Sequence, residues 1–522
     1  MQKLKKIIKS NKPLLFTFLG FFTIHLLLLN INFAEWGDSY RILRASEHLR
    51  EFTYPEDEKR PPLFSLLLAL RPPSIDQVLW GRLEMLGISF ITLIVFYKLL
   101  KVMKFSEEFA IFALWLLILN PVHLYWSLRI MADVPFGLIA LVVIFLLKKW
   151  DKEITFGKAT LIGLVLGLGV LTRFEGYILG LSVGMGILLD NISSLKDFNS
   201  LKKVFTTYIF IGLGFFTITL PWFIYRNPFQ SSYFEEPQNR IYDLNMVVIY
   251  VLSVAFIFGL IYAPFIFFKG KTEIINMLKN NKVLAIFVLF ELFLALMWPA
   301  AIPRLFTPAV PFLIIIFVQG LRMYLKSSSK LCRYDYIALL IIFGIYVVGQ
   351  YFYKLQFLVL IKSLFLISIL LQTVVIVSFL KKASTKLMYV SVVSMFIWSV
   401  SIVLLHKDIF KPVVLANQYV VKNIHGKIAY NDVSSVSDWY LNQKSKTDNV
   451  SGTYLNMDSK TGRTYDVIRN KEVDYIMITN EHNPNLEFSA DDANYLEEIA
   501  EFRYTIRGKE FFTKIVKFNK TN

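Results

Sequence analysis

Apolar stretches recur along this chain almost to Leu405, and each has roughly 15 to 23 residues, enough to cross a ~30 Å hydrocarbon core. Hydrophobic residues make up 55% of the chain and charged residues only 18%, which agrees with a chain dissolved mostly in lipid. The approximate cores of these stretches are 14–31, 78–100, 109–126, 134–147, 159–172, 177–189, 204–225, 246–268, 283–298, 305–321, 336–353, 357–380 and 387–405. The sequence therefore predicts an α-helical polytopic membrane protein with about thirteen transmembrane helices.

The basic residues indicate how these helices are oriented. When the spans are threaded alternately, the Lys-rich connections fall on one side of the membrane: 98–104, 148–152, 196–203, 269–271, 322–333 and 381–386. The positive-inside rule makes that side cytoplasmic. The run 13–31 is too long for a signal peptide, so we expect a retained first span, a cytoplasmic N-terminus and an extracytoplasmic C-terminus. The net charge of +17 then belongs mostly to these loops, and no nucleic-acid partner is expected.

The chain becomes polar from His406 onward. Strand-like runs at 427–430, 473–479 and 510–518 alternate with helix-like segments near Val413 and Asn494. We therefore expect a transmembrane domain at 1–405, with an external loop at 32–77, followed by a small extracytoplasmic α/β domain at 406–522. Cys332 is the only cysteine, so no intramolecular disulfide or cysteine metal cluster can form.

An Asp, Lys or Arg side chain costs roughly 2.5 to 3.5 kcal/mol at the centre of a membrane helix. Charged residues that persist at external helix ends are therefore the candidates for catalytic and binding residues. Directly after the first span come Glu35, Trp36, Gly37 and Asp38. The Asp38 carboxylate could abstract a proton from an incoming hydroxyl. The alternative is that Asp38 caps a helix over 39–50, since Asp is a favoured N-cap residue.

The same loop continues with Glu58, Lys59 and Arg60, followed by an apolar stretch at 65–70 that is too short to cross the bilayer. That stretch predicts a re-entrant or interfacial helix. Two cations at headgroup depth can hold a lipid phosphate by charge-assisted hydrogen bonds. General attraction to anionic headgroups is the alternative explanation for both.

Further charges occupy the predicted external turns. Arg129 and Asp133 lie four residues apart in a short hairpin, a spacing that an ordinary helical ion pair would also show. Arg173 and Glu175 lie in the turn between two Gly-rich spans, and Arg304 opens a later span. An anionic lipid-linked substrate would give several arginines a common partner, whereas each one alone could simply be snorkelling to the interface.

The order of these pieces resembles the GT-C class of polytopic glycosyltransferases, in particular the branch that includes protein O-mannosyltransferases and the bacterial aminoarabinose transferases for lipid A. The resemblance is carried by motifs that all fall on the predicted external side: Trp36-Gly37-Asp38, Lys59-Arg60-Pro61-Pro62-Leu63, Arg82-Leu83, Arg129 with Asp133-Val134-Pro135, and Pro303-Arg304-Leu305-Phe306 with Pro308 and Pro311.

The resemblance implies a donor sugar on a polyprenyl or dolichyl phosphate. The sugar would be transferred outside the cell, usually with inversion, to an acceptor hydroxyl of a protein, lipid or glycan. Asp38 would then be the general base and Asp133 would assist or orient. The residues implied to bind the donor phosphate are Lys59, Arg60, Arg129 and Arg304. Further site candidates are Glu35, Arg41, Glu58, Arg82, Arg173 and Glu175. No cofactor is assigned, and a divalent metal is left open because the external loops lack the paired Asp-x-Asp motifs of oligosaccharyltransferases.

Two other kinds of protein could share part of this organisation. A transporter or a flippase for lipid-linked sugars would also be polytopic, but it would more often show matched repeat halves or helices broken at corresponding positions. A binding protein that is merely anchored in the membrane would not need so many spans.

Overall fold

The computed structural model describes most of the chain. The described residues are 12–150, 154–193, 197–226, 244–298, 303–326, 331–353, 362–381, 384–432, 435–442, 449–454, 473–481, 496–506 and 509–518. They divide into two compact units. The first comprises Met1–Leu29 and Tyr54–Leu404, and the second comprises Asn30–Thr53 and Leu405–Asn522. The segment directly after the first helix thus belongs to the same unit as the C-terminal residues.

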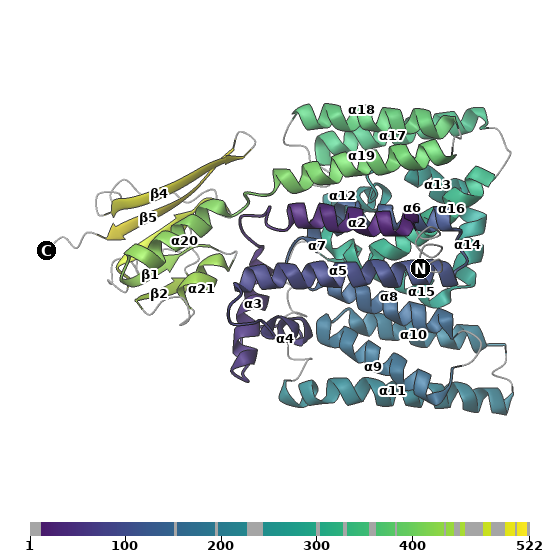
Figure 1. Ribbon diagram of the computed structural model, residues 1–522, viewed down its shortest axis with the longest axis horizontal. Coiled ribbons are helices and arrows are strands. Elements are labelled where there is room, and N and C mark those ends of the chain that lie inside the picture. Colours follow the sequence, from purple (N-terminus) through teal and green to yellow (C-terminus); the bar gives the residue numbers. More distant parts are fainter. Residues whose placement is uncertain are drawn as a thin grey trace, which may run out of the picture. The chain divides into compact units, whose positions relative to one another are not determined.

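The first unit is built from helices that lie side by side along one direction (Figure 1). Its elements are α2 (Lys12–Leu28), α4 (Leu63–Ala69), α5 (Gln77–Val102), α6 (Glu107–Ile118), α7 (Pro121–Ser127), α8 (Asp133–Lys149), α9 (Phe156–Thr172), α10 (Gly176–Asn191), α11 (Phe198–Tyr225), α12 (Leu244–Ala255), α13 (Ala263–Lys269), α14 (Lys271–Lys279), α15 (Lys282–Met297), η4 (Pro303–Ala309), α16 (Val310–Lys326), α17 (Arg333–Tyr353), α18 (Lys362–Leu380) and α19 (Ser384–Leu405).

Among the described residues, four helical segments are long and apolar enough to span a membrane unaided: Gln77–Val102, Phe198–Tyr225, Arg304–Lys326 and Thr385–Leu405. Two bent pairs raise this number to six, namely α6 with α7, bent by 58°, and α14 with α15, bent by 112°. The remaining apolar helices are shorter. The chain is a multi-pass membrane protein, but the structure does not confirm the predicted count of about thirteen helices.

Two of the predicted spans are interrupted for local reasons. The span predicted at 109–126 is broken at Asn120, whose side chain accepts hydrogen bonds from the amides of Val122 and His123 and so starts a new helix. The span predicted at 246–268 is split between α12 and α13, and Gly259 in the connection has a left-handed φ of +61°. Both breaks place non-helical backbone inside the protein, where other protein groups can satisfy it.

Close backbone contacts fix the helices that carry the charged residues described below. Helices α9 and α11 touch through Gly163, which faces the carbonyl of Ile211, and Gly214, which faces the carbonyl of Thr160. Such small residues allow helix backbones to approach closely in membranes. Helix α8 packs between α5 and α9, and α10 packs on α15.

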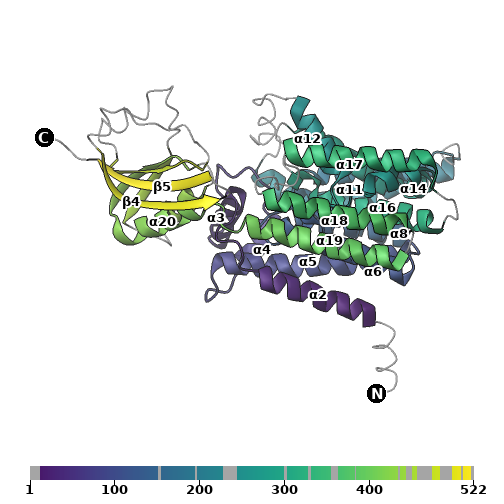
Figure 2. The ribbon, with the colours of Figure 1, turned by 90° about the horizontal axis from the view of Figure 1, so that it is seen from above.

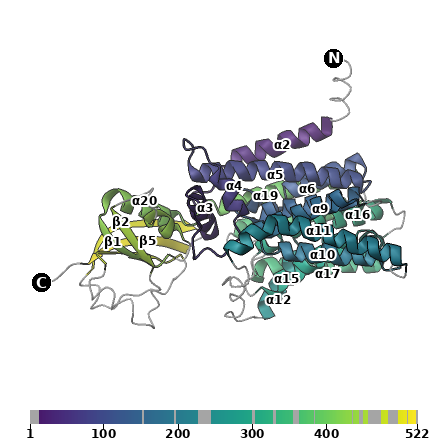
Figure 3. The same ribbon diagram turned by 90° about the horizontal axis from the view of Figure 1, so that it is seen from below.

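The second unit contains a five-stranded sheet in the order β2-β1-β3-β5-β4. Its elements are α3 (Gly37–Arg50), α20 (Lys411–Asn423), β1 (Gly426–Tyr430), α21 (Val436–Leu441), β2 (Val450–Tyr454), β3 (Tyr475–Thr479), β4 (Leu496–Ile506) and β5 (Lys509–Phe518). Strand β1 is parallel to β2 and β3, whereas β5 is antiparallel to β3 and β4. Helix α20 covers one face of the sheet through Ala416 and Val420, which pack on Ile428 and Ile515 (Figures 2 and 3).

Helix α3 is held against α21 in this unit. The Arg44 guanidinium pairs with Asp438 at 2.9 Å, and the Arg41 Nε donates a hydrogen bond to Ser435 Oγ at 3.0 Å. The Tyr40 ring lies 6.0 Å from that of Trp439, centroid to centroid. Residues far apart in the sequence therefore form one small α/β unit.

The strand-like runs and the helix near Val413 predicted for the tail correspond to β1, β3, β5 and α20. Strands β2 and β4 and helix α21 were not predicted. The helix expected near Asn494 lies outside the described residues, and the next described segment, Leu496–Ile506, is a strand.

Candidate functional site

A buried ionic cluster lies where α8 begins and α9 ends. Asp133 is in the first turn of α8 and is fully buried. Its Oδ1 accepts a hydrogen bond from Arg173 Nη1 at 2.9 Å, and Arg173 Nη2 donates to Glu175 Oε1. Arg173 is the C-cap of α9 and Glu175 the N-cap of α10, so one tight turn presents both residues to Asp133.

Two more arginines reach the same region. Arg304, in η4, has its Nε 3.6 Å from Asp133 Oδ1, and its guanidinium lies 5.6 Å from the centroid of the Trp126 ring. The Arg129 guanidinium lies 4.8 Å from the centroid of the Tyr125 ring, and Arg129 is only 1% exposed. Short helix α7 therefore supplies an aromatic ring for each guanidinium. Such packing restricts the orientation of the guanidinium group.

Glu291 adds a carboxyl group that the sequence analysis missed. It projects from the apolar helix α15, is 2% exposed, and interacts electrostatically with Arg173, Glu175 and Asp133. Its Oε1 has no hydrogen-bond partner among the described residues. The available signal was a single acidic residue inside a 16-residue apolar helix, the kind of placement that marks functional groups in membranes.

We name Arg129, Asp133, Arg173, Glu175 and Arg304 the arginine cluster. It contains three guanidinium groups and two carboxylates, Glu291 adds a buried carboxyl group beside it, and Oδ2 of Asp133 lacks a hydrogen-bond partner within the described structure. Guanidinium groups that are held in place and largely shielded from water are well suited to bind a phosphate and to stabilise charge that develops on it.

The loop that precedes α4 holds a second ionic site. Glu58 is 1% exposed, and its Oε1 accepts hydrogen bonds from both the backbone amide and the Nη1 of Arg60, each at 2.9 Å. Lys59 is half-buried beside them. Arg226, at the end of α11, donates to the carbonyls of Pro55 and Glu56 and ties the loop to the bundle. The short apolar helix predicted to follow is α4, which packs on α5 and α9.

Arg82 lies in the first turns of α5 and is 8% exposed. Its neighbour Gly81 faces Ile130, the residue after Arg129, and a Cβ at Gly81 would come 2.7 Å from Ile130 Cδ1. The absence of a side chain at this position lets the segment that carries Arg129 pack directly on α5.

Glu35, Asp38 and Arg41 belong to the second unit. Glu35 is fully buried, and its backbone amide donates to Tyr40 Oη at 3.2 Å. Asp38 lies in the first turn of α3 and is half-buried, whereas Trp36 occupies the N-cap position. A carboxylate in a first turn is stabilised by the helix dipole without having to be the cap.

Among the described residues, no group of three or more His, Cys, Asp or Glu is arranged to hold a metal ion.

A family model for dolichyl-phosphate-mannose-protein mannosyltransferases matches residues 75–233, the part of the chain that includes α5 to α11 and most of the arginine cluster. No curated protein sequence matches the chain.

Solved structures match this chain over nearly its whole length. A crystal structure of ArnT from Cupriavidus metallidurans bound to undecaprenyl phosphate is similar with a TM-score of 0.63 and 12% identity, covering 97% of this chain and 98% of that one. The apo structure of the same protein gives 0.61 and 13%, covering 95% and 97%. The mycobacterial arabinofuranosyltransferase AftD gives 0.48 and 10%, covering 96% of this chain and 40% of that one.

Proposed function

From the GT-C fold that this chain shares with polytopic glycosyltransferases, we propose that it transfers a sugar from a polyprenyl- or dolichyl-phosphate donor to an acceptor hydroxyl. The acceptor is a protein, lipid or glycan on the extracytoplasmic side, and the anomeric configuration is inverted. The observation that carries this proposal is the arginine cluster, which concentrates buried guanidinium groups at one end of a membrane bundle.

The donor chemistry explains why such a cluster would be useful. As the acceptor oxygen bonds to the anomeric carbon, the bond from that carbon to the phosphate oxygen breaks and the lipid phosphate leaves with an additional negative charge. Hydrogen-bond donors of the protein that are already held in place stabilise that charge without reorganising at the moment of reaction. Arg129 and Arg304 rest on aromatic rings and are the leading candidates for this role, with Lys59 and Arg60 as further phosphate ligands.

The contacts favour a positioning role for Asp133. Its Oδ1 already binds Arg173 and lies near Arg304, so its charge serves to orient these guanidinium groups. Glu58 would play the same part for Arg60. Asp38 is therefore our candidate for the general base that takes the proton from the acceptor hydroxyl.

The orientation of the chain is part of the proposal. The Lys-rich connections support a cytoplasmic N-terminus, which would place the arginine cluster and the C-terminal unit outside.

The proposal is tested by purifying the protein in nanodiscs and measuring transfer of labelled sugar from a panel of polyprenyl-phosphate sugars. Asp38→Asn should abolish turnover while donor binding remains. Glu51→Gln is the matched control, because Glu51 is an exposed carboxylate at the other end of α3. Turnover that survives Asp38→Asn would move the base elsewhere.

The alternative hypothesis, a transporter or flippase for lipid-linked sugars, predicts a different result with the same preparation. If well-folded protein transfers no sugar from any donor but moves a lipid-linked sugar between the leaflets of a vesicle, the transferase proposal is wrong.

A further inference from the structure

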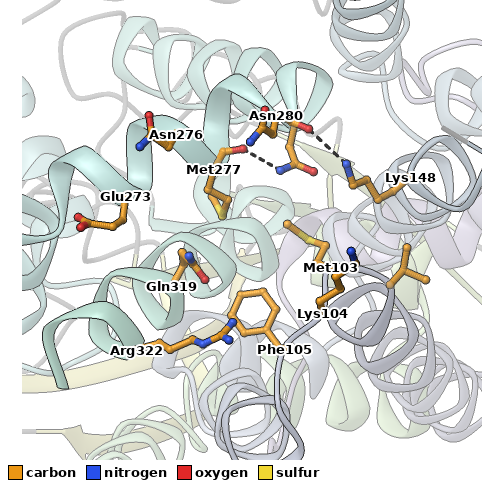
Figure 4. A pocket seen from close by; sticks show the side chains of 12 residues that line it. Met103, Lys104, Phe105, Lys148, Glu273, Asn276, Met277, Asn280, Gln319 and Arg322 are labelled. Carbon is orange, nitrogen blue, oxygen red and sulfur yellow. Dashed lines mark hydrogen bonds between the residues drawn. The ribbon is translucent and has the colours of Figure 1, made fainter. Parts of the chain in front are cut away.

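A polar cavity of about 470 Å³ opens at the end of the first unit opposite the arginine cluster. Lys148 lies 15 residues after Asp133 on α8, so the two are about 22 Å apart along the helix. The cavity is lined by side chains from α8, α14, α16 and the residues after α5 (Figure 4). The polar ones that matter here are Lys104, Lys148, Asn276, Asn280, Gln319 and Arg322.

Two cations of this cavity, Lys104 and Arg322, have no counter-ion within the described part of the chain. Among the described residues, the side chains of Lys104 and Arg322 form no ion pair and no hydrogen bond, and Lys148 Nζ donates to the backbone carbonyl of Asn280 at 3.3 Å. Glu273 is the carboxylate among the described lining residues, and Figure 4 shows it on the opposite side of the cavity from Lys148. Three cations and one carboxylate leave the lining with an excess of positive charge.

A neighbouring cavity provides a useful contrast. It has a volume of about 390 Å³ and shares Lys148 with the first. Its other lysine, Lys282, is paired with Asp190 at 2.7 Å and also donates to the carbonyl of Leu189. That lysine already has its counter-ion, whereas no described residue pairs with Lys104 or Arg322 in the larger cavity.

We propose that the larger cavity, lined by Lys104, Lys148 and Arg322, binds a phosphate-bearing ligand. The ammonium and guanidinium groups supply charge-assisted hydrogen bonds, and the amide groups of Asn276 and Gln319 add neutral donors around the same space. Basic residues near one membrane face are expected of any polytopic protein, but general membrane attraction does not require them to converge on one hollow together with amide side chains.

The ligand has two sources with the same chemistry, the headgroup of an anionic lipid and a soluble phosphate compound. Either would bind far from the arginine cluster, so the site is independent of the proposed donor site. A bound headgroup would tie the loop after α5 to α14 and α16, which provide the rest of the lining.

The test uses full-length protein in phosphatidylcholine nanodiscs, titrated either with phosphatidylglycerol or with inorganic phosphate. Native mass spectrometry reports bound lipid, and calorimetry reports bound phosphate. Arg322→Gln and Lys104→Gln should each weaken binding at least fivefold. Lys279→Gln is the matched control, because Lys279 ends α14, is exposed and does not line the cavity. It should change the affinity less than twofold.

A second measurement needs no variant. Lysine-directed chemical labelling of the wild-type protein should be slowed at Lys104 and Lys148 by the bound ligand and unchanged at Lys279. Saturation by phosphatidylglycerol alone identifies a lipid site, and saturation by inorganic phosphate identifies a soluble ligand. Equal losses of affinity in Arg322→Gln and Lys279→Gln, or unchanged labelling of Lys104, would overturn the proposal.

Discussion

Replacing Asp133 with Asn would separate positioning from proton transfer at the arginine cluster. The substitution keeps the shape of the side chain but removes the charge that holds Arg173 at 2.9 Å and Arg304 at 3.6 Å. Arg173 retains Glu175 as a partner, so the turn between α9 and α10 should persist. Arg304 loses its carboxylate neighbour at 3.6 Å and retains the contact with the Trp126 ring.

The size of the effect follows from the bond that is weakened. A hydrogen bond to a charged group contributes about 1.5 to 3 kcal/mol. If the arginines act in the transition state, losing that contribution should lower kcat/KM about 10- to 150-fold, since each 1.36 kcal/mol is a factor of ten. The assay is transfer of labelled sugar from the donor that the wild-type protein accepts, measured over a range of pH.

The pH dependence identifies the role. A positioning residue that is replaced should leave the shape of the pH–rate profile unchanged, whereas replacing the base should remove its acidic limb. A double-mutant cycle with Arg173→Gln should show coupling, because the two side chains are in direct contact. A profile that loses its acidic limb in Asp133→Asn, or a rate within twofold of wild type, would refute the reasoning.

Three further substitutions test the packing of a helix turn, the protonation of a buried carboxyl group and the strength of an ion pair. Gly176→Ala would push a Cβ into the backbone of the preceding helix and should cost about 1 to 3 kcal/mol in thermal unfolding and lower transfer activity, whereas Gly180→Ala, which meets nothing within 4 Å, should do neither. Burial raises the pKa of the Glu481 carboxyl to about 7, so the folded protein binds this proton more tightly than the unfolded chain. Stability should then fall as pH rises from about 4.5 to 7, and Glu481→Gln should abolish that dependence in unfolding curves of the full-length protein. Asp438→Asn breaks the pair with Arg44, and because both side chains are partly exposed it should lower the free energy of unfolding by no more than about 1 kcal/mol.

Much of the helical framework could be predicted from the sequence, because apolar length is a direct physical requirement of the bilayer. Most predicted cores overlap an observed helix, although Asn120 and Gly259 interrupt two of them. Helix α14 was not predicted, since its segment is too polar and too short to be recognised by apolar length. The short helix after Arg60 was predicted because its length excluded a full crossing.

Part of the candidate site could be predicted from the sequence. Asp133, Arg173, Glu175 and Arg304 were singled out as charges at helix ends, and the structure brings them together. Glu291 was missed because it lies in the middle of an apolar helix rather than at its end. Its electrostatic neighbours come from other helices, so its own sequence neighbourhood carries no sign of them.

The tail was harder to predict for a related reason. Strand β4 reads LEEIAEFRYTI, in which acidic residues and helix-forming residues favour a helix locally. Its pairing with β5, across which Arg503 forms an ion pair with Glu510, overrides that preference. Helix α3 gives no local indication that its partner is α21.

The pairing of α3 with α21 also sets an order on the synthesis of the protein. Arg44 and Asp438 are separated by 394 residues, so at 5 to 20 residues per second the ribosome needs about 20 to 80 seconds to supply the second after the first. During that time α21 has not yet been made, so the face of α3 that packs on it stays uncovered while the membrane helices are inserted. A product that ended before the C-terminal unit would contain the Asp38 segment but not the surface that holds it. The last part of the chain to be made therefore completes one of the first.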